Sequence, residues 1–368
     1  MFTKVTNYIN KLIEEKELPL LDVLVKKESE EVYRHYGSHT GDFGKDEKLC
    51  MFSCTKVLTA VSGMKLLEEG KIFLDDPVAK YIPAFSEAFT LDENGNKRTE
   101  VITVRNLFTM SSGFDYNRMT PEIVKLAEER YDTATTTDVV SELVKRPLQF
   151  KPGERFLYSL SHDALGALIE TVSGMNLAEY MQRHILTPLG MENSTMYYEK
   201  YVENLPIVHK ITENGFESDG GKTYGSRNPV KNYRNGGSHL ISTVSDYSVF
   251  ADTLASGGIT KDGYRLIKSE TIEKMKEVHF NAVNVNNTFT CVQGADYGYG
   301  LGVRVRTVPH PSGIPVGEFG WDGAAGSYVL VDTDNKISIT MGMNILNWPK
   351  IFRGEHLEIV SRIYEELV

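Results

Sequence analysis

Segments that favour β-strands lie near both ends of this chain, and a long helix-rich stretch separates them. Residues 20–35 carry apolar runs on either side of the charged stretch 26–31, which predicts a hairpin. Strand-like runs return at 299–308, 326–332 and 337–343. The economical solution is one mostly antiparallel sheet to which both ends of the chain contribute. We therefore expect an α+β fold.

Helical periodicity predicts what covers this sheet and what interrupts it. Residues 2–16 and 356–367 are amphipathic, and we expect these terminal helices to flank the sheet. At 368 residues the chain is long for one core, so we expect a sheet domain of residues 1–74 and 231–368 with a helical lobe, 75–230, inserted into it. A site is expected in the cleft between them. The lobe's helices are predicted at 103–110, 121–130, 137–146 and 161–186.

The charge balance narrows the class of partner. Lys and Arg number 40 and Asp and Glu number 50, giving a formal net charge of −10, which disfavours nucleic acid and anionic membranes as partners. No apolar run reaches membrane-spanning length, and the first residues do not resemble a signal segment. The three cysteines, Cys50, Cys54 and Cys291, form no disulfide framework, so we expect a cytoplasmic protein with reduced thiols. Its histidines show no metal-ligand spacing, and no metal or cofactor is expected.

Ser53 is the strongest candidate for a nucleophile, because Lys56 follows it in the S-x-x-K pattern. If Ser53 opens a helix, Lys56 lies one turn further along the same face, where a neutral amine can take the hydroxyl proton. Desolvation or a nearby cation would lower the pKa of the lysine and favour that neutral form. The same pattern recurs at Ser62 and Lys65, but Ser62 precedes two glutamates, which suggests a solvated face.

Several segments in a shared order make the chain resemble the class C β-lactamase-like serine hydrolases, and within them the family VIII carboxylesterases. The resemblance implies a β-lactamase/transpeptidase-like fold and covers most of the chain, from about Phe52 to about Met343. Each segment is weak alone, and their order is the specific signal. The segments are Phe52–Lys56, Gly70–Pro77, Leu107–Phe114, Pro152–Ser159, Gly236–Thr243 and Gly320–Gly326.

The resemblance implies that a tyrosine on a loop of the helical lobe completes the proton relay, and Tyr158 matches it. A phenol beside two other titrating groups can shuttle a proton between nucleophile and leaving group. Two other tyrosines, Tyr8 and Tyr233, fit the Y-x-N pattern more literally. Tyr8 falls in the N-terminal amphipathic helix and is expected to pack, whereas Tyr233 falls in a loop beside glycines where it can line a pocket.

A third element implied by the resemblance is a strand edge beside the nucleophile, matched here by Trp321, Asp322 and Gly323. Lactamases usually carry Lys-Thr-Gly there, and family VIII esterases commonly carry Trp-x-Gly. The resemblance also implies an oxyanion hole formed by the backbone N–H groups of Ser53 and Ala324. The small residues around Ala324 allow the close approach that backbone donors need.

Two departures from the lactamase pattern bear on the substrate. Leu160 stands where lactamases usually have an asparagine that binds a substrate amide, and Trp321 replaces a lysine that meets a substrate carboxylate. With Tyr233 and His239 as further candidate pocket residues, we expect a small-molecule substrate, preferably an uncharged ester with a small or medium acyl group. A β-lactamase or D-alanyl-D-alanine carboxypeptidase, an acyltransferase, and a non-catalytic binding protein are the alternatives. The oligomeric state is not predicted.

Overall fold

The computed structural model describes residues 2–41, 44–197, 206–213, 215–219, 228–281, 296–346, 348 and 351–367. Cys291 lies outside these residues. The helices are α1 Thr3–Lys16, α2 Thr55–Glu68, α3 Val104–Phe108, α4 Pro121–Arg130, α5 Thr136–Leu143, α6 Ser161–Ser173, α7 Leu177–Met181, α9 Val244–Ala255, α10 Ser269–Lys276 and α11 His356–Leu367. The strands are β1 Leu21–Lys27, β2 Glu30–Gly37, β3 Leu49–Cys50, β4 Phe89–Leu91, β5 Lys97–Thr99, β6 His209–Thr212, β7 Gly215–Ser218, β8 Ile241–Ser242, β9 Tyr297–Tyr299, β10 Arg304–Arg306, β11 Phe319–Asp322, β12 Tyr328–Asp332, β13 Ile337–Gly342 and β14 Ile345–Leu346.

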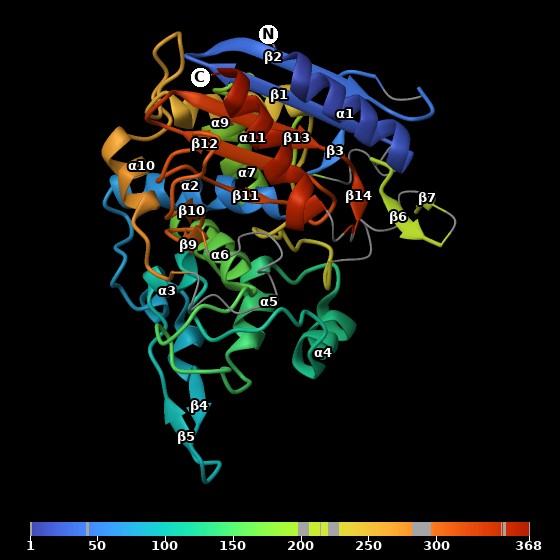
Figure 1. Ribbon diagram of the computed structural model, residues 1–368. Helices are drawn as coiled ribbons and strands as arrows, with labels where there is room; N and C mark the ends of the chain where they lie inside the picture. The colour runs from blue at the N-terminus through green and yellow to red at the C-terminus, as the bar shows by residue number, and fades with distance from the viewer. Residues whose placement is uncertain are drawn as a thin grey trace.

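Both ends of the chain build one seven-stranded sheet, in the order β2-β1-β13-β12-β11-β10-β9. Its neighbouring strands are antiparallel, and β1 joins the N-terminal hairpin to the C-terminal strands through β13. In Figure 1 this sheet occupies the upper part of the molecule, while α3, α4, α5 and the β4–β5 hairpin lie below it. The α+β class and the β-lactamase/transpeptidase-like architecture are therefore confirmed.

Side chains on alternate faces of the sheet pack into two different apolar clusters. Leu24 and Trp321 belong to the cluster that includes residues of α2, α6 and α9. Val23, one residue away from Leu24, belongs to the cluster formed with α1 and α11. Because successive side chains of a strand point to opposite faces, one strand can serve both clusters. The terminal helices therefore cover one face, as expected, and the other face packs against α2 and α9.

Three local predictions are wrong. The run 299–308 is broken at residues 300–303 into β9 and β10, and the long helix 161–186 ends at Ser173, where Gly174 adopts a φ of +73°. Ser62 is buried, not on a solvated face, and its hydroxyl donates to the carbonyl of Leu58. The helix α2 is buried on nearly all sides, so a polar residue within it is no sign of solvent.

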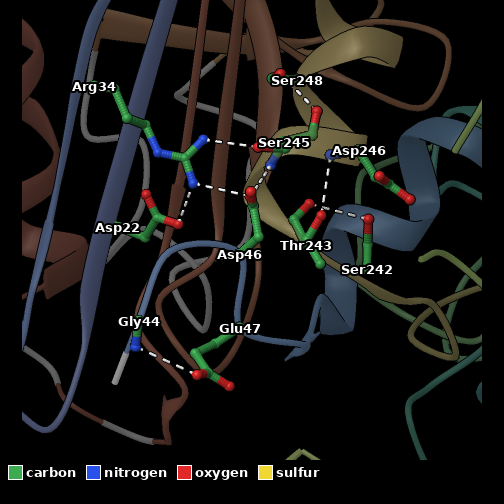
Figure 2. Close-up of polar contacts among 10 residues, drawn as sticks. All are labelled: Asp22, Arg34, Gly44, Asp46, Glu47, Ser242, Thr243, Ser245, Asp246 and Ser248. Atoms are coloured by element: carbon green, nitrogen blue, oxygen red, sulfur yellow. Dashed lines mark hydrogen bonds and ion pairs between the residues drawn. The ribbon is translucent and has the colours of Figure 1, made fainter. Parts of the chain in front are cut away.

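A charge cluster, buried at Asp22 and partly exposed at Asp46, links the N-terminal hairpin to α9 (Figure 2). The Arg34 guanidinium on β2 donates to Asp22 at 2.6 Å, to Asp46 at 3.0 Å and to the Ser245 hydroxyl at 3.0 Å. Burial raises the pKa of Asp22 to about 6, although the adjacent Arg34 opposes that shift. Since each charge has a partner, the cluster links β1, β2, the loop before β3 and the start of α9.

Among the described residues, no helix has both the length and the apolar character needed to cross a membrane.

Candidate active site

Ser53 lies in a sharply bent segment between β3 and α2. The chain leaves β3, passes Phe52 with a φ of +43°, and makes a single 3₁₀ turn over Phe52–Cys54 that continues into α2. A positive φ is unfavourable for a phenylalanine, and such conformations persist where the surrounding structure imposes them. The Sγ of Cys54 contacts the carbonyl of Trp321 on β11 at 3.6 Å, so the nucleophile segment also packs against the sheet.

The structure brings Ser53, Lys56 and Tyr158 together. The phenol of Tyr158 donates to Ser53 Oγ at 2.7 Å, and Lys56 Nζ donates to the same oxygen at 3.2 Å. Lys56 Nζ also donates to the carbonyl of Gly237 at 2.8 Å. All three side chains are buried, although they come from the α2 turn and from the loop before α6. A hydroxyl, an amine and a phenol in mutual contact form a set of groups that can exchange protons.

The surroundings of Lys56 favour its charged form. Burial by itself lowers the pKa of Lys56, but the phenols of Tyr116 and Tyr158 and the carboxylate of Asp163 raise it, and the net shift is upward. This direction is opposite to the one that desolvation alone predicts. Burial also raises the pKa of Tyr158. Negative charge on either phenol, or on Asp163, therefore favours the ammonium form of Lys56.

Tyr158 is held between two aromatic rings. The Tyr116 ring stacks on one side with centroids 5.4 Å apart, and Trp321 stacks on the other at 5.6 Å. The Tyr299 ring packs edge-on against Trp321, with the ring centroids 5.3 Å apart. Tyr116 comes from a loop that leads into α4, whereas Trp321 lies on β11. A ring from the loop before α4 and a ring from the sheet thus fix the plane of the Tyr158 phenol.

Tyr116 is the site residue that sequence reasoning missed. The surrounding protein raises its pKa, but the cations of Lys56 and Arg118 outweigh this effect, so the pKa of Tyr116 falls below its ordinary value. The Arg118 guanidinium lies 5.3 Å above the Tyr116 ring. Only its position in the sequence could have indicated a role for Tyr116, because it lies two residues after the Leu107–Phe114 segment.

The proposed oxyanion donor Ala324 lies in the turn between β11 and β12. The N–H of Gly326 donates to the carbonyl of Gly323 at 2.9 Å, and the N–H of Gly323 donates to the carbonyl of Ser327 at 2.7 Å. Neither bond uses the N–H of Ala324. A Cβ on Gly323 would lie 1.9 Å from Ser327 Oγ and 2.4 Å from the carbonyl of Met51, so this close approach requires glycine.

Three other residues predicted to line the pocket make different contacts inside the protein. Leu160, Tyr233 and His239 are buried. Leu160 packs in the core at the start of α6, and His239 Nδ1 accepts from the N–H of Asn235 at 3.2 Å. The Tyr233 phenol donates to Asp163 at 2.6 Å, and Asp163 is one of the groups that raise the pKa of Lys56. Their contact with a substrate stays a prediction.

Asp322 does not face the site. Its neighbour Trp321 stacks on Tyr158, and strand alternation therefore turns the Asp322 carboxylate to the opposite face of the sheet. There Asp322 lies 3.6 Å from Arg304 and 3.3 Å from His356 of α11. The expectation that Asp322 lines the substrate pocket is wrong for this reason.

The alternative sequence matches find other partners. Lys65 Nζ donates to the carbonyl of Leu266 at 2.7 Å, while Ser62 bonds within its own helix, so these residues form no second Ser–Lys pair. The Tyr8 phenol donates to Glu355 at 2.5 Å between α1 and the segment before α11. Within the described ranges, no three His, Cys, Asp or Glu side chains gather closely enough to hold a metal ion.

Two curated relatives match about three quarters of this chain. Protein Rv1367c of Mycobacterium tuberculosis is 26% identical over 307 residues, covering 78% of this chain and 75% of its own length. A putative D-alanyl-D-alanine carboxypeptidase of Escherichia coli is 27% identical over 303 residues, covering 76% of this chain and 64% of its own.

Solved structures show the same fold at low identity. EstCE1, described as a hydrolase with promiscuous acyltransferase activity, superposes with a TM-score of 0.79 at 20% identity, covering 99% of this chain and 98% of its own. Unliganded simvastatin synthase of Aspergillus terreus gives 0.76 at 18% identity, with 99% and 98% covered. The model of the family described as Beta-lactamase matches residues 5–361. The chain therefore belongs to the beta-lactamase family.

Proposed function

We propose that this protein is a serine hydrolase that cleaves small or medium uncharged acyl esters through an acyl-enzyme on Ser53. The observation that carries the proposal is the convergence of the Tyr158 phenol and Lys56 Nζ on Ser53 Oγ, at 2.7 and 3.2 Å. A serine hydroxyl becomes nucleophilic only when a neighbouring group takes its proton. This pair supplies such a group within hydrogen-bond reach.

In the proposed mechanism the Lys56–Tyr158 pair first loses one proton. The result is either an amine beside a phenol or an ammonium beside a phenolate, and the two forms differ only in where the proton lies. Either form can accept the Ser53 proton as Oγ attacks the ester carbonyl. The N–H groups of Ser53 and Ala324 stabilise the oxyanion, and Tyr158 returns the proton to the leaving alcohol.

The aromatic surroundings support an uncharged acyl group. Tyr116, Tyr158 and Trp321 present a series of stacked rings beside Ser53, and the residue Tyr116 is 38% exposed. Such rings add apolar contact area for an acyl chain. Trp321 stands where a lactamase carries a cation, which weakens the case for a carboxylate-bearing β-lactam.

Purified protein can test the proposal directly. A fluorophosphonate probe should label the wild type, and the label should be lost in Ser53→Ala. The wild type should hydrolyse p-nitrophenyl butyrate faster than the β-lactam nitrocefin. Faster turnover of nitrocefin, or labelling by a fluorescent penicillin without ester turnover, would instead identify the lactamase or carboxypeptidase alternative.

Acyl transfer is a second candidate, and the fold neighbours favour it. EstCE1 and simvastatin synthase carry acyltransferase or synthase activity in their descriptions and share this architecture. An acyl-enzyme resolved by an alcohol in place of water gives a new ester. If added butanol diverts product from butyrate to butyl butyrate without slowing p-nitrophenol release, the acyl-enzyme accepts alcohols.

A further inference from the structure

A histidine of the C-terminal helix lies at the base of the turn that carries Ala324. His356 is the first residue of α11 and is 4% exposed. Its Nε2 lies 3.1 Å from the carbonyl oxygen of Gly326, and its Nδ1 lies 3.3 Å from Asp322 Oδ1. Asp322 is the last residue of β11 before the turn, and Gly326 is the last residue of the turn. One imidazole therefore contacts both ends of this turn.

The turn depends on contacts from outside itself. Gly326 adopts a φ of +83°, and two backbone hydrogen bonds close the turn: its N–H donates to the carbonyl of Gly323 at 2.9 Å, and the N–H of Gly323 donates to the carbonyl of Ser327 at 2.7 Å. The remaining anchors come from elsewhere. The N–H of Ile345 donates to the carbonyl of Ala325 at 2.9 Å, and the Ser327 hydroxyl donates to the carbonyl of Met51 at 2.7 Å. His356 provides the anchor from the side of the sheet that faces away from Ser53.

The chemistry of the imidazole suits this position. A carbonyl oxygen only accepts, so the contact with Gly326 requires a proton on Nε2 of His356. The other ring nitrogen, Nδ1, then faces the Asp322 carboxylate at 3.3 Å. The Tyr328 ring packs on the imidazole with centroids 4.7 Å apart, and Arg304 shares the Asp322 carboxylate at 3.6 Å. The ring is thus confined on several sides.

We propose that His356 is a positioning residue that holds the 323–326 turn so that the N–H of Ala324 faces the oxyanion formed at Ser53. The inference rests on the proposed function. His356 touches no substrate, because α11 packs on the opposite face of the sheet from α2. Its effect passes through the backbone between Asp322 and Gly326.

The test compares His356→Gln with Tyr364→Phe. Tyr364 lies on the same helix, and its phenol donates to Asp332 on β12 at 2.9 Å, so each substitution removes a buried contact between helix and sheet. We expect His356→Gln to lower kcat/KM for p-nitrophenyl butyrate by roughly 10- to 100-fold, mostly in kcat, because a displaced oxyanion donor weakens transition-state binding. Affinity for an alkyl boronic acid, which forms a tetrahedral adduct, should fall by a similar factor. Tyr364→Phe should change both by less than about twofold.

Equal losses in the two variants would overturn the inference, since they would report general docking of α11. A rise in KM alone, with kcat and boronate affinity unchanged, would also overturn the inference. If His356→Gln does not fold, Asp322→Asn removes the charge facing Nδ1 while keeping the side-chain shape. Asp322→Asn should also lower kcat, and an unchanged kcat would contradict the positioning role of His356.

The same set of proteins separates this inference from the proposed function. If a fluorophosphonate does not label Ser53 in the wild type, the assignment of Ser53 as the nucleophile is refuted. A labelled wild type that hydrolyses no ester would refute the esterase activity alone. In that case the labelling rate constants of the His356 and Tyr364 variants give the same comparison, because phosphonylation also places an oxygen in the oxyanion site.

Discussion

Tyr158→Phe isolates the contribution of one oxygen atom. The phenyl ring can keep its place between Tyr116 and Trp321, whose ring centroids lie 5.4 and 5.6 Å away. Only the hydroxyl that donates to Ser53 Oγ at 2.7 Å is removed. Ser53 keeps its contact with Lys56 at 3.2 Å, so the variant loses the phenol and leaves the nucleophile and the amine in place.

The expected magnitudes separate catalysis from stability. A positioned acid–base group contributes about 10²- to 10⁴-fold, or about 3–5 kcal/mol of transition-state stabilisation. Loss of one hydrogen bond changes folding stability by about 1 kcal/mol. We therefore expect kcat/KM to fall roughly 1,000-fold while the free energy of unfolding changes by no more than about 1 kcal/mol.

A matched control is available on α9. The Tyr247 phenol is also buried and donates to the carbonyl of Cys54, directly beside the nucleophile, at 2.9 Å. Tyr247→Phe should retain most activity, because that phenol bonds backbone and not Ser53. The assay is steady-state hydrolysis of p-nitrophenyl butyrate with urea unfolding of each variant. The reasoning is refuted if Tyr158→Phe keeps more than about a tenth of kcat/KM, or if both variants lose it equally.

Three further predictions concern pH and stability. First, kcat/KM should rise with pH above neutrality, because Lys56 and Tyr158 both have raised pKa values and the pair must lose a proton; a flat profile from pH 6 to 9 would contradict this. Second, Arg34→Met leaves the buried Asp22 carboxylate and the partly exposed Asp46 carboxylate without their cation, and should lower the unfolding free energy in urea by about 3–5 kcal/mol. Arg98→Met, which removes an exposed guanidinium from its surface pair with Asp92, should cost less than about 1 kcal/mol. Third, burial raises the pKa of Glu170 to about 7, so the folded state binds its proton more tightly than the unfolded state, and stability is lost as pH rises from about 4.5 through 7. Glu170→Gln should therefore gain up to about 3 kcal/mol over the wild type at pH 8 and almost nothing at pH 4.5, and an equal gain at both would be contrary to the cause given.

The sequence predicts the architecture better than it predicts individual strands. Both ends of the chain meet in one sheet, because strand runs that flank a helical segment leave few other partners for each other. The hydrophobic pattern does not predict β11, and the reason is burial. All four residues Phe319–Asp322 are buried, so the strand lacks the polar alternation of a half-exposed one. Only the family resemblance placed a strand edge at Trp321.

The same limitation explains the misplaced side chains. Ser62 precedes two glutamates in sequence but lies inside a helix that is buried on nearly all sides, where the carbonyl of Leu58 in the same helix accepts a hydrogen bond from its hydroxyl. Asp322 sits next to Trp321 in sequence but on the other face of the sheet. Tyr116 and His356 belong to no recognised motif and reach the site region only through packing of separate elements. A motif identifies which residues can react, and tertiary contacts decide which residues hold them.

Protonation is the property that sequence reasoning was least able to supply. An S-x-x-K pattern suggests a lysine made neutral by desolvation, yet the direction of the shift at Lys56 is set by Tyr116, Tyr158 and Asp163, which lie in three different segments. The titrations of the two phenols and Lys56 are coupled, because a proton lost from either phenol leaves negative charge beside the same ammonium. Activity that rises with pH would therefore report this particular cluster, whereas any member of the family with a reactive serine would be labelled by a fluorophosphonate. For this reason the pH profile tests the geometry of the site more sharply than the labelling experiment does.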